Sequence, residues 1–500
     1  MSLAVGNAPA QAAPLSRGLL RLAGWVAAIG VVFAHLTWSH PQFDLEARLY
    51  AGLLGAMTVM SLAYLKPGQF PALPMLLAQF YLGMGFPTFS EPELFGIYGR
   101  VRLSSRCLTA ASLGSLVFAG SMVVFSFLGR PLGRRAAPSV IRHLEPARDA
   151  RGWVSSALLL VGCLGAILYI LVQRGGTPRP IAFIAYAFST PPTSLSPLIW
   201  EVVQTGSRRA RILLVGTTGM MVFAGLLTGM LSNALAPIFA VGLALWFLRG
   251  RAPMLLASAG LVVFIVLSPV KHIYRTLTWE KQNQVSTEQR IDNWVEAFDR
   301  TYSNRDSKAS VEQSTKISKD RLSMLTQVAQ VFEWVPRFVP YAGPELWLAS
   351  PLELIPRVFW PEKPLHVLLF NKTYTRTFRL QKGSYREQTT INLPSVADGY
   401  WRLGWLGVVF EGALLGFLAG FFEALASRRS LATLTLGVTF LGATQPTVHV
   451  ITNVTSLPQL CFAVGLVLLA VRLCGVIANR VGRPVLLEPA RSAGSAGRSL

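Results

Sequence analysis

Long apolar stretches dominate this sequence and limit what it can fold into. From residue 18 onward, runs of about 20 apolar residues recur, which is the length that a helix needs to cross a membrane. Apolar residues make up 52% of the 500 positions and charged residues only 14%, whereas soluble domains carry roughly 25% charged residues. We therefore expect an all-α, polytopic membrane helix bundle.

Hydropathy and charge together predict about twelve spans. Prolines interrupt one of these runs, at 181–204, and we expect it to be discontinuous, since broken segments are tolerated where protein or a water-filled cavity surrounds them. The runs are 18–37, 49–65, 70–88, 107–129, 152–173, 181–204, 212–230, 231–249, 253–270, 403–426, 431–447 and 457–474.

Positive charge gathers in the short loops between these runs. The net charge is +22, yet residues 271–402 hold 19 Lys and Arg against 14 Asp and Glu, so most of the excess lies elsewhere. A basic loop is expected at 130–151, and its arginines place it in the cytoplasm by the positive-inside rule. The same rule puts both termini inside and residues 271–402 on the outer, periplasmic face of a bacterial inner membrane. This distribution fits membrane lipids as partners and not nucleic acid.

Four parts follow from this topology: a membrane bundle at 1–270, an outer segment at 271–402, late spans at 403–475 and a basic tail at 476–500. The first apolar run has no cleavage site and is expected to be a retained span. The cysteines lie in or beside apolar runs, with no disulfide framework and no metal-ligand spacing; they are Cys107, Cys163, Cys461 and Cys474. We expect neither a metal nor a cofactor.

The outer segment is expected to contain two amphipathic helices. Apolar residues recur at helical spacing from Ile291 to Tyr302, after the candidate caps Ser286 and Thr287. A second pattern of this kind covers residues 319–335. The simplest role for both apolar stripes is packing, against the membrane surface or against each other.

A proline corner at residues 355–364 combines cations with aromatic rings. Arg357 and Lys363 lie on either side of Trp360, and three prolines exclude a regular helix interior. One interpretation is a corner at the membrane interface, where Trp and Arg are common. The other is a cradle for a sugar attached to phosphate.

Further polar side chains are expected on the outer face, where apolar spans meet water. With the proline corner, their cations would bind a dianion such as diphosphate without a metal, although anchoring at the interface is the alternative for each arginine. Asp398 is the candidate general base; an ion pair with Arg402 that holds the loop to the bundle is an equal alternative. These candidates are Lys271, His272, Arg275, Asp398, Tyr400, Arg402 and His449.

Two of these stretches, together with the layout, resemble bacterial O-antigen polymerases of the Wzy type and oligosaccharide repeat-unit polymerases in general. Residues 355–364, IPRVFWPEKP, are similar to the family's IPR-x-x-WP-x-KP stretch. Residues 398–407, DGYWRLGWLG, resemble its GE-x-Y-x-NFG-x-x-G motif, with Asp398 in place of Glu and Arg402 in place of Asn. Many spans with one large, late outer loop are also typical of the family.

The resemblance implies a GT-C-like membrane glycosyltransferase that works without a metal in polysaccharide or lipopolysaccharide biosynthesis. Both substrates would be glycans on undecaprenyl diphosphate, and a chain-length regulator and a flippase would be further partners. Arg275, Arg357 and Lys363 would stabilise the leaving diphosphate, while Asp398, or alternatively His449, would accept the hydroxyl proton. The substrate-binding residues would be Lys271, His272, Trp360, Lys363, Tyr400 and Arg402.

Three other functions stay open at this point. An O-antigen ligase would use the same donor but pass the glycan to lipid A–core. A polyprenyl-phosphate-sugar transferase would use an acidic pair in the first outer loop, where Asp44 and Glu46 lie. A flippase or exporter of lipid-linked sugars would place charged residues near the middle of its spans.

Overall fold

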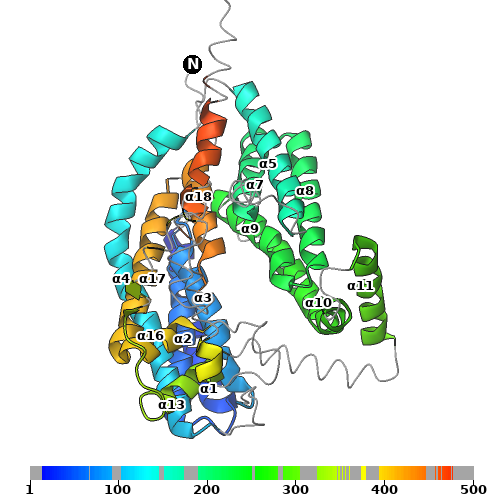
Figure 1. Cartoon of the computed structure of the whole chain (residues 1–500). Helices are drawn as coiled ribbons and strands as arrows, with labels where there is room; N and C mark the ends of the chain where they lie inside the picture. Colours follow the sequence, from blue (N-terminus) through cyan, green and yellow to red (C-terminus); the bar gives the residue numbers. More distant parts are fainter. Residues whose placement is uncertain are drawn as a thin grey trace, which may run out of the picture.

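The computed structural model is all-helical, with no strand in the part of the chain that it describes (Figure 1). That part comprises residues 14–92, 103–145, 151–173, 190–249, 254–279, 285–303, 324–348, 373–378, 393–445 and 457–476, with single positions left out inside some ranges, and also Leu352, Ile355 and Trp360. The all-α architecture confirms the expected fold class.

Fourteen α-helices and one 3₁₀ helix are described, together with a further apolar helix near the C-terminal end, Leu460–Leu473. In chain order they are α1 (Pro14–Trp38), α2 (Leu45–Ala63), α3 (Ala72–Met84), η1 (Phe86–Phe89), α4 (Ser105–Leu144), α5 (Arg151–Gln173), α7 (Pro191–Thr205), α8 (Arg208–Leu227), α9 (Leu231–Arg249), α10 (Met254–Trp279), α11 (Thr287–Tyr302), α13 (Leu325–Trp334), α16 (Ser395–Leu403), α17 (Trp405–Ala426) and α18 (Leu431–Ala443).

Five of the described helices are long and apolar enough to cross a membrane: α1 from Gly18, α4, α8, α9 and α17. Shorter apolar helices occur at Ala157–Leu171, Ser258–Lys271, Leu431–Ala443 and Leu460–Leu473. The chain is therefore a membrane protein, as its composition predicts. Each of the twelve expected runs overlaps a described helix, while the total of twelve spans stays a prediction.

Helix α4 extends further than we expected. We expected a span to end at residue 129 and a basic loop to follow. Instead, α4 is a single helix of 40 residues that runs from Ser105 to Leu144 through Pro131 and Pro138. Four arginines of the expected loop therefore lie on this helix, beyond its apolar run: Arg130, Arg134, Arg135 and Arg142. Charge marks where a helix leaves the membrane, and it does not by itself end the helix.

Helices α4 and α17 pack backbone to backbone along a glycine seam. Gly412, Gly416 and Gly420 of α17 recur at every fourth position, and a Cβ at any of them would overlap the backbone of α4. From the other side, Gly129 and Gly133 of α4 approach the backbone of α17 equally closely. Small residues at this spacing are how helices associate in membranes, where close packing replaces the hydrophobic effect.

The two ends of the bundle differ in composition. In Figure 1, α13 and α16 lie at the lower end and the last turns of α4 at the upper end. At the upper end, Arg472 Nη1 donates to the carbonyl oxygen of Arg142, and the Glu145 carboxylate accepts the first two amides of α18. Basic residues therefore gather at the end opposite α13 and α16.

The two expected amphipathic helices are present. Helix α11 begins at Thr287 with Ser286 as its N-cap in a capping box, which confirms the predicted start. Its Trp294 stacks on Tyr274 of α10 at 4.5 Å. Helix α13 covers Leu325–Trp334 and buries its apolar side, as predicted; residues 319–323 lie outside the described part of the chain.

Candidate functional site

Residues 398–407 form a sharp elbow between short helix α16 and membrane helix α17. At the bend, Gly404 has a φ of +61°, a conformation that favours glycine. Gly399, before the bend, and Gly407, after it, lie so close that a Cβ on either one would overlap the backbone of the other. The elbow therefore folds α16 back against the first turns of α17.

A buried ion pair lies in this elbow. Arg402 Nε donates to Asp398 Oδ1 at 2.7 Å, and the two side chains are 2% and 0% exposed. The same guanidinium donates through Nη1 to the carbonyl oxygen of Gly343 at 3.2 Å and lies 5.7 Å from the Trp347 ring centroid. The ion pair that we considered for Asp398 is thus confirmed. It lies within α16, and the contact with Gly343 links α16 to an earlier part of the outer segment. The role of Asp398 as a general base stays a prediction.

A second carboxylate, Glu411 of α17, is buried beside this pair. Its side chain is fully buried. The charges of Asp398 and Arg402 act on it, and the side chains of Asp398 and Trp347 are close enough to interact with it as hydrogen-bond partners. Within the described residues, neither Glu411 oxygen has a partner in normal hydrogen-bond geometry, nor does Asp398 Oδ2. The cluster Asp398–Arg402–Glu411, called the elbow cluster below, therefore contains two carboxyl groups and one cation.

Glu411 was missing from the predicted site, although the sequence contains a signal for it. Glu411 follows Gly407 by four residues, so both lie on one face of α17. Gly407 is the residue that meets α16. A glutamate inside an apolar span, one turn from a glycine at a helix contact, points to a buried charge at that contact.

Aromatic rings surround Tyr400 on the side of α16 that faces α13. The Tyr400 ring stacks on Phe332 at 3.8 Å and meets Trp405 edge-on at 5.8 Å. Burial, with a smaller contribution from Tyr341, raises the pKa of Tyr400, so its hydroxyl stays protonated at neutral pH. Tyr400 is half-buried and can donate a hydrogen bond to a bound sugar.

The candidates near the end of α10 occupy a different setting. Arg275 is half-buried, and its Nε donates to the carbonyl oxygen of Gly229 at 2.9 Å. Lys271 is half-buried on the same helix, which also contains His272. Helix α10 packs on α9 and α11, whereas α16 packs on α17 and α13. Arg275 therefore already binds a backbone carbonyl, the kind of contact that its anchoring alternative predicts.

Three predicted residues, Arg357, Lys363 and His449, lie outside the described part of the chain. Trp360 of the proline corner is described and half-buried. Convergence of the outer cations on one cavity thus stays a prediction. Within the described residues, no group of three His, Cys, Asp or Glu side chains is arranged to hold a metal ion.

A second charged contact lies near the opposite end of α17. Glu423 Oε1 accepts from Arg130 Nη2 at 2.8 Å and from Gln69 Nε2 at 2.5 Å. Glu423 is 2% exposed and Arg130 is 24% exposed. This contact joins α17, α4 and the loop before α3. Helix α17 thus carries one buried glutamate with a cation of its own, and another, Glu411, whose nearby cation already pairs with Asp398.

Asp44, the first residue of the acidic pair considered for a transferase, has a structural role. Asp44 is the N-cap of α2, because its Oδ1 accepts the amide of Ala47 at 2.9 Å. Its carboxylate also accepts the hydroxyl of Thr109 on α4. Both oxygens are used in holding helices, which weakens the transferase alternative that rests on Asp44 and Glu46.

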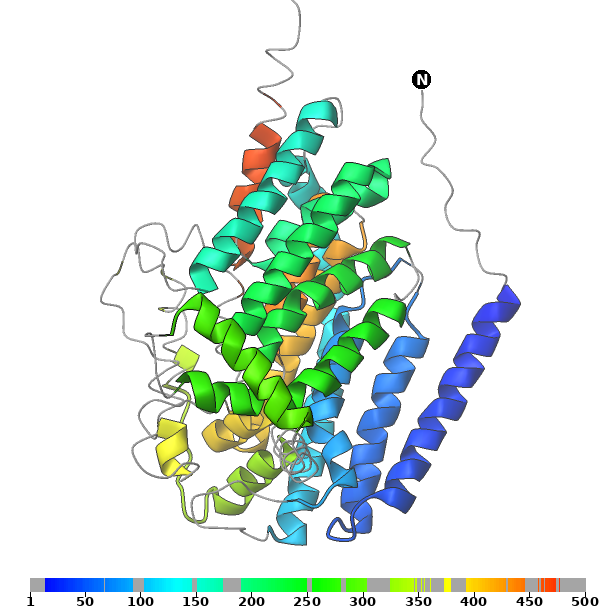
Figure 2. The same ribbon diagram turned by 90° about the vertical axis from the view of Figure 1, so that its right-hand side faces the viewer.

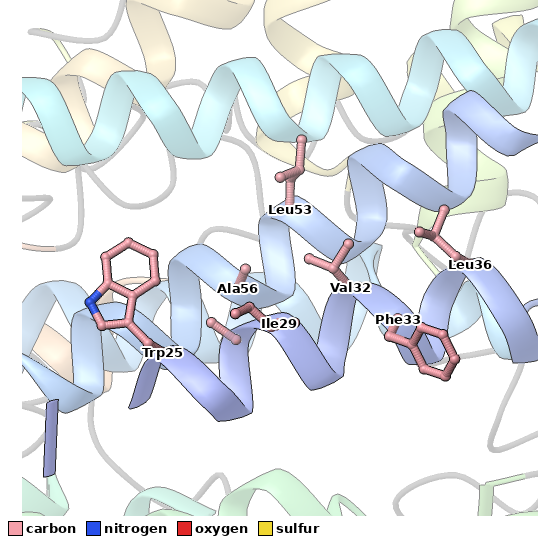
Figure 3. A pocket seen from close by; sticks show the side chains of 8 residues that line it. Trp25, Ile29, Val32, Phe33, Leu36, Leu53 and Ala56 are labelled. Atoms are coloured by element: carbon pink, nitrogen blue, oxygen red, sulfur yellow. The ribbon is translucent and has the colours of Figure 1, made fainter. Parts of the chain in front are cut away.

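An apolar groove of about 380 Å³ runs between α1 and α2 (Figure 3). Helix α1 stands at the edge of the bundle beside α2 (Figure 2), so the groove faces outward. Arg21 lies on the same helix one turn before Trp25, with its guanidinium 5.2 Å from the Tyr64 ring centroid. The groove is lined by Trp25, Ala28, Ile29, Val32, Phe33, Leu36, Leu53 and Ala56. Its chemistry suits a lipid chain.

Comparison with known proteins gives one match. A family model described as a domain of unknown function (DUF8712) is similar to residues 200–442, a range that takes in α8 to α17 and the whole expected outer segment. No curated protein matches the chain. The matched range includes every residue of the elbow cluster.

Proposed function

We propose that this protein is a membrane glycosyltransferase that polymerises oligosaccharide repeat units carried on undecaprenyl diphosphate, for an O-antigen or an exopolysaccharide. The observation that carries the proposal is the elbow cluster. It places buried ionisable groups at the junction between a membrane helix and the segment that contains the predicted diphosphate cations. An enzyme that acts on lipid-linked sugars needs its chemistry at such a junction.

The finer architecture belongs to the same proposal: about twelve spans in a GT-C-like bundle, in a bacterial inner membrane, with residues 271–402 in the periplasm. Two observations support this orientation. The basic contacts of α4 and the helix ending at Leu473 gather at one end of the bundle, and α13 and α16 lie at the other (Figure 1). Positively charged ends remain in the cytoplasm.

The proposed reaction forms one glycosidic bond. A hydroxyl oxygen of the acceptor repeat unit attacks the anomeric carbon of the donor glycan, and the bond from that carbon to the diphosphate oxygen breaks. Undecaprenyl diphosphate leaves with the electron pair, stabilised by Arg275, Arg357 and Lys363. Asp398 takes the hydroxyl proton, with His449 as the alternative base.

Within this proposal, the remaining candidates hold the substrates. Arg402 orients Asp398 and keeps its carboxylate ionised, because Arg402 Nε lies 2.7 Å from Asp398 Oδ1. Trp360 and Tyr400 offer aromatic surfaces to sugar rings, and Lys271 and His272 of α10 are further substrate-binding candidates. The partners are lipid-linked glycans, membrane lipids, a chain-length regulator and a flippase.

The depth of the buried charges favours chemistry at the membrane surface over transport. Glu411 lies six residues after Trp405, which is about 9 Å along the helix axis. Glu423 lies about 27 Å along the same axis. The centre of a hydrocarbon core about 30 Å thick lies between them. A carrier would be expected to place its ionisable groups near that centre.

The proposal is tested with the purified protein in lipid vesicles, given an undecaprenyl-diphosphate-linked repeat unit and no added metal. Extension to a ladder of glycans supports a polymerase. Transfer that occurs only when lipid A–core is supplied supports a ligase, and movement of the lipid-linked sugar across the membrane without a new bond supports a flippase. Either of these two results would overturn the proposed polymerisation.

The role of Arg357 is tested by Arg357→Ala in cells and in vesicles. We expect normal insertion and only single repeat units, because the leaving diphosphate loses a cation. Arg300→Ala is the matched control: it also removes an arginine of the outer segment, but Arg300 is an exposed residue of α11 that pairs with Glu296. A full-length ladder from Arg357→Ala would remove Arg357 from the mechanism.

A further inference from the structure

The elbow cluster contains more negative than positive charge. Asp398, Arg402 and Glu411 are each at most 2% exposed. Arg402 neutralises one carboxylate, that of Asp398, because its Nε donates to Asp398 Oδ1. Among the described residues, a second ionised carboxylate in the same buried space would have no cation of its own, which is strongly unfavourable.

Among the described residues of the other elements that pack around the cluster, none supplies a further charge to Glu411. Helix α4 presents Phe118 and Ser121 beside Gly412, one residue from Glu411. The segment before α16 contributes the Trp347 ring and the Gly343 carbonyl, and α13 contributes Phe332. Among the described residues, the charged groups that act on Glu411 are Asp398 and Arg402.

Glu423 provides an internal comparison. It is an equally buried glutamate of the same helix, but it receives hydrogen bonds from both Arg130 and Gln69. Neither oxygen of Glu411 receives a hydrogen bond of normal geometry from the described residues. Helix α17 therefore contains two buried glutamates in different surroundings. Glu423 has hydrogen-bond donors that suit an ionised carboxylate, whereas the described residues give Glu411 none of normal geometry.

We propose that Glu411 holds a proton at neutral pH and shares it with Asp398, so that the elbow cluster is a proton-binding carboxyl pair with Arg402 on its Asp398 side. Two carboxyl groups that share a buried site keep one proton between them, because both cannot be ionised there. The ion pair with Arg402 leaves Asp398 as the ionised member.

For catalysis, this makes Glu411 a positioning residue that acts through Asp398. As a neutral neighbour, Glu411 keeps Asp398 ionised and fixed at the elbow. Glu411 itself would become ionised only if its proton moved to Asp398. This catalytic part rests on the proposed function, whereas the location of the proton does not.

Infrared spectroscopy tests the location of the proton without any reaction. The full-length protein in lipid nanodiscs at pH 7 should show the carbonyl band of a protonated carboxyl group, with the usual shift in D₂O. We expect Glu411→Gln to abolish this band and Glu423→Gln, the matched control on the same helix, to keep it. A band that survives in Glu411→Gln overturns the proposal, and so does one that is lost only in Glu423→Gln.

Asp398→Asn tests the sharing itself. With a neutral residue at 398, Arg402 would turn to Glu411 as its partner, and Glu411 would give up its proton. The infrared band should therefore disappear in Asp398→Asn although Glu411 is still present. A band that persists in this variant means that the two groups do not share a proton, and the proposal fails.

Chain extension tests the catalytic part separately. Glu411→Gln keeps the shape and neutrality of the side chain but removes its proton, so we expect the pH profile of chain extension to change: the alkaline decline caused by deprotonation of the pair should be lost. Asp398→Asn should lose about 100-fold or more, the usual contribution of a general base. A loss in Glu411→Gln as large as that in Asp398→Asn overturns the positioning role. If wild type itself does not extend glycans, the proposed function fails while the infrared result stands.

Discussion

Replacing Arg402 with methionine removes the cation that pairs with Asp398 while keeping an apolar stem of similar length. The guanidinium lies 2.7 Å from the carboxylate, with both side chains at most 2% exposed, so solvent screens the pair very little. Breaking a buried ion pair by removing one partner costs about 3–5 kcal/mol. At 1.4 kcal/mol per factor of ten, this lowers the ratio of folded to unfolded protein roughly 100- to 4,000-fold.

The double variant Asp398→Leu with Arg402→Met removes both charges and isolates the reason for this loss. Replacing a whole buried pair by apolar residues is often neutral, so we expect its stability to return to within about 1 kcal/mol of wild type. Reversible unfolding in mixed micelles titrated with SDS, followed by helical circular dichroism, measures both differences. A loss below about 1 kcal/mol in Arg402→Met, or no recovery in the double variant, would refute the reasoning from buried charge.

Three further predictions concern the helix contacts and use the same unfolding assay. Gly420→Leu should lower the free energy of unfolding by about 3 kcal/mol, because it overpacks the seam with α4. Gly120→Leu on α4 should be close to neutral, since a Cβ at Gly120 would meet no neighbouring atom within 4 Å. Equal effects of the two substitutions would contradict the seam. Glu423→Gln should cost about 1–3 kcal/mol, because it weakens a pair in which Arg130 is partly exposed. Asp44→Ala should cost about 1 kcal/mol through loss of the α2 cap, and an unchanged stability would remove that role.

The sequence predicted the elements of the fold because a helix in a membrane is determined largely by local composition. Long apolar runs located helices, five of which are long and apolar enough to cross a membrane. The spacing of apolar residues after Ser286 located α11, and Ser286 is one of the two candidate caps. The basic run from Arg130 led to a wrong loop, because α4 continues as a helix beyond its apolar part. Local patterns define helices well and define their ends less well.

The candidate site was predicted in part. Asp398, Tyr400 and Arg402 were identified from a motif, and the structure brings them together at the elbow. Glu411 was not, because its role depends on the contact between Gly399 and Gly407, which places α17 against α16 and becomes evident only once the bend at Gly404 is known. The roles of Arg357, Lys363 and His449 stay predictions, since these residues lie outside the described part of the chain.

The glycine seam determines which motions the bundle permits. Its three glycines on α17 repeat every four residues, so a shift of α17 by one or two positions would drive bulky side chains into the backbone of α4. The next allowed register is a full four-residue step, about 6 Å along the axis. Gradual sliding is therefore excluded, and α4 with α17 form a fixed frame to which the elbow is attached.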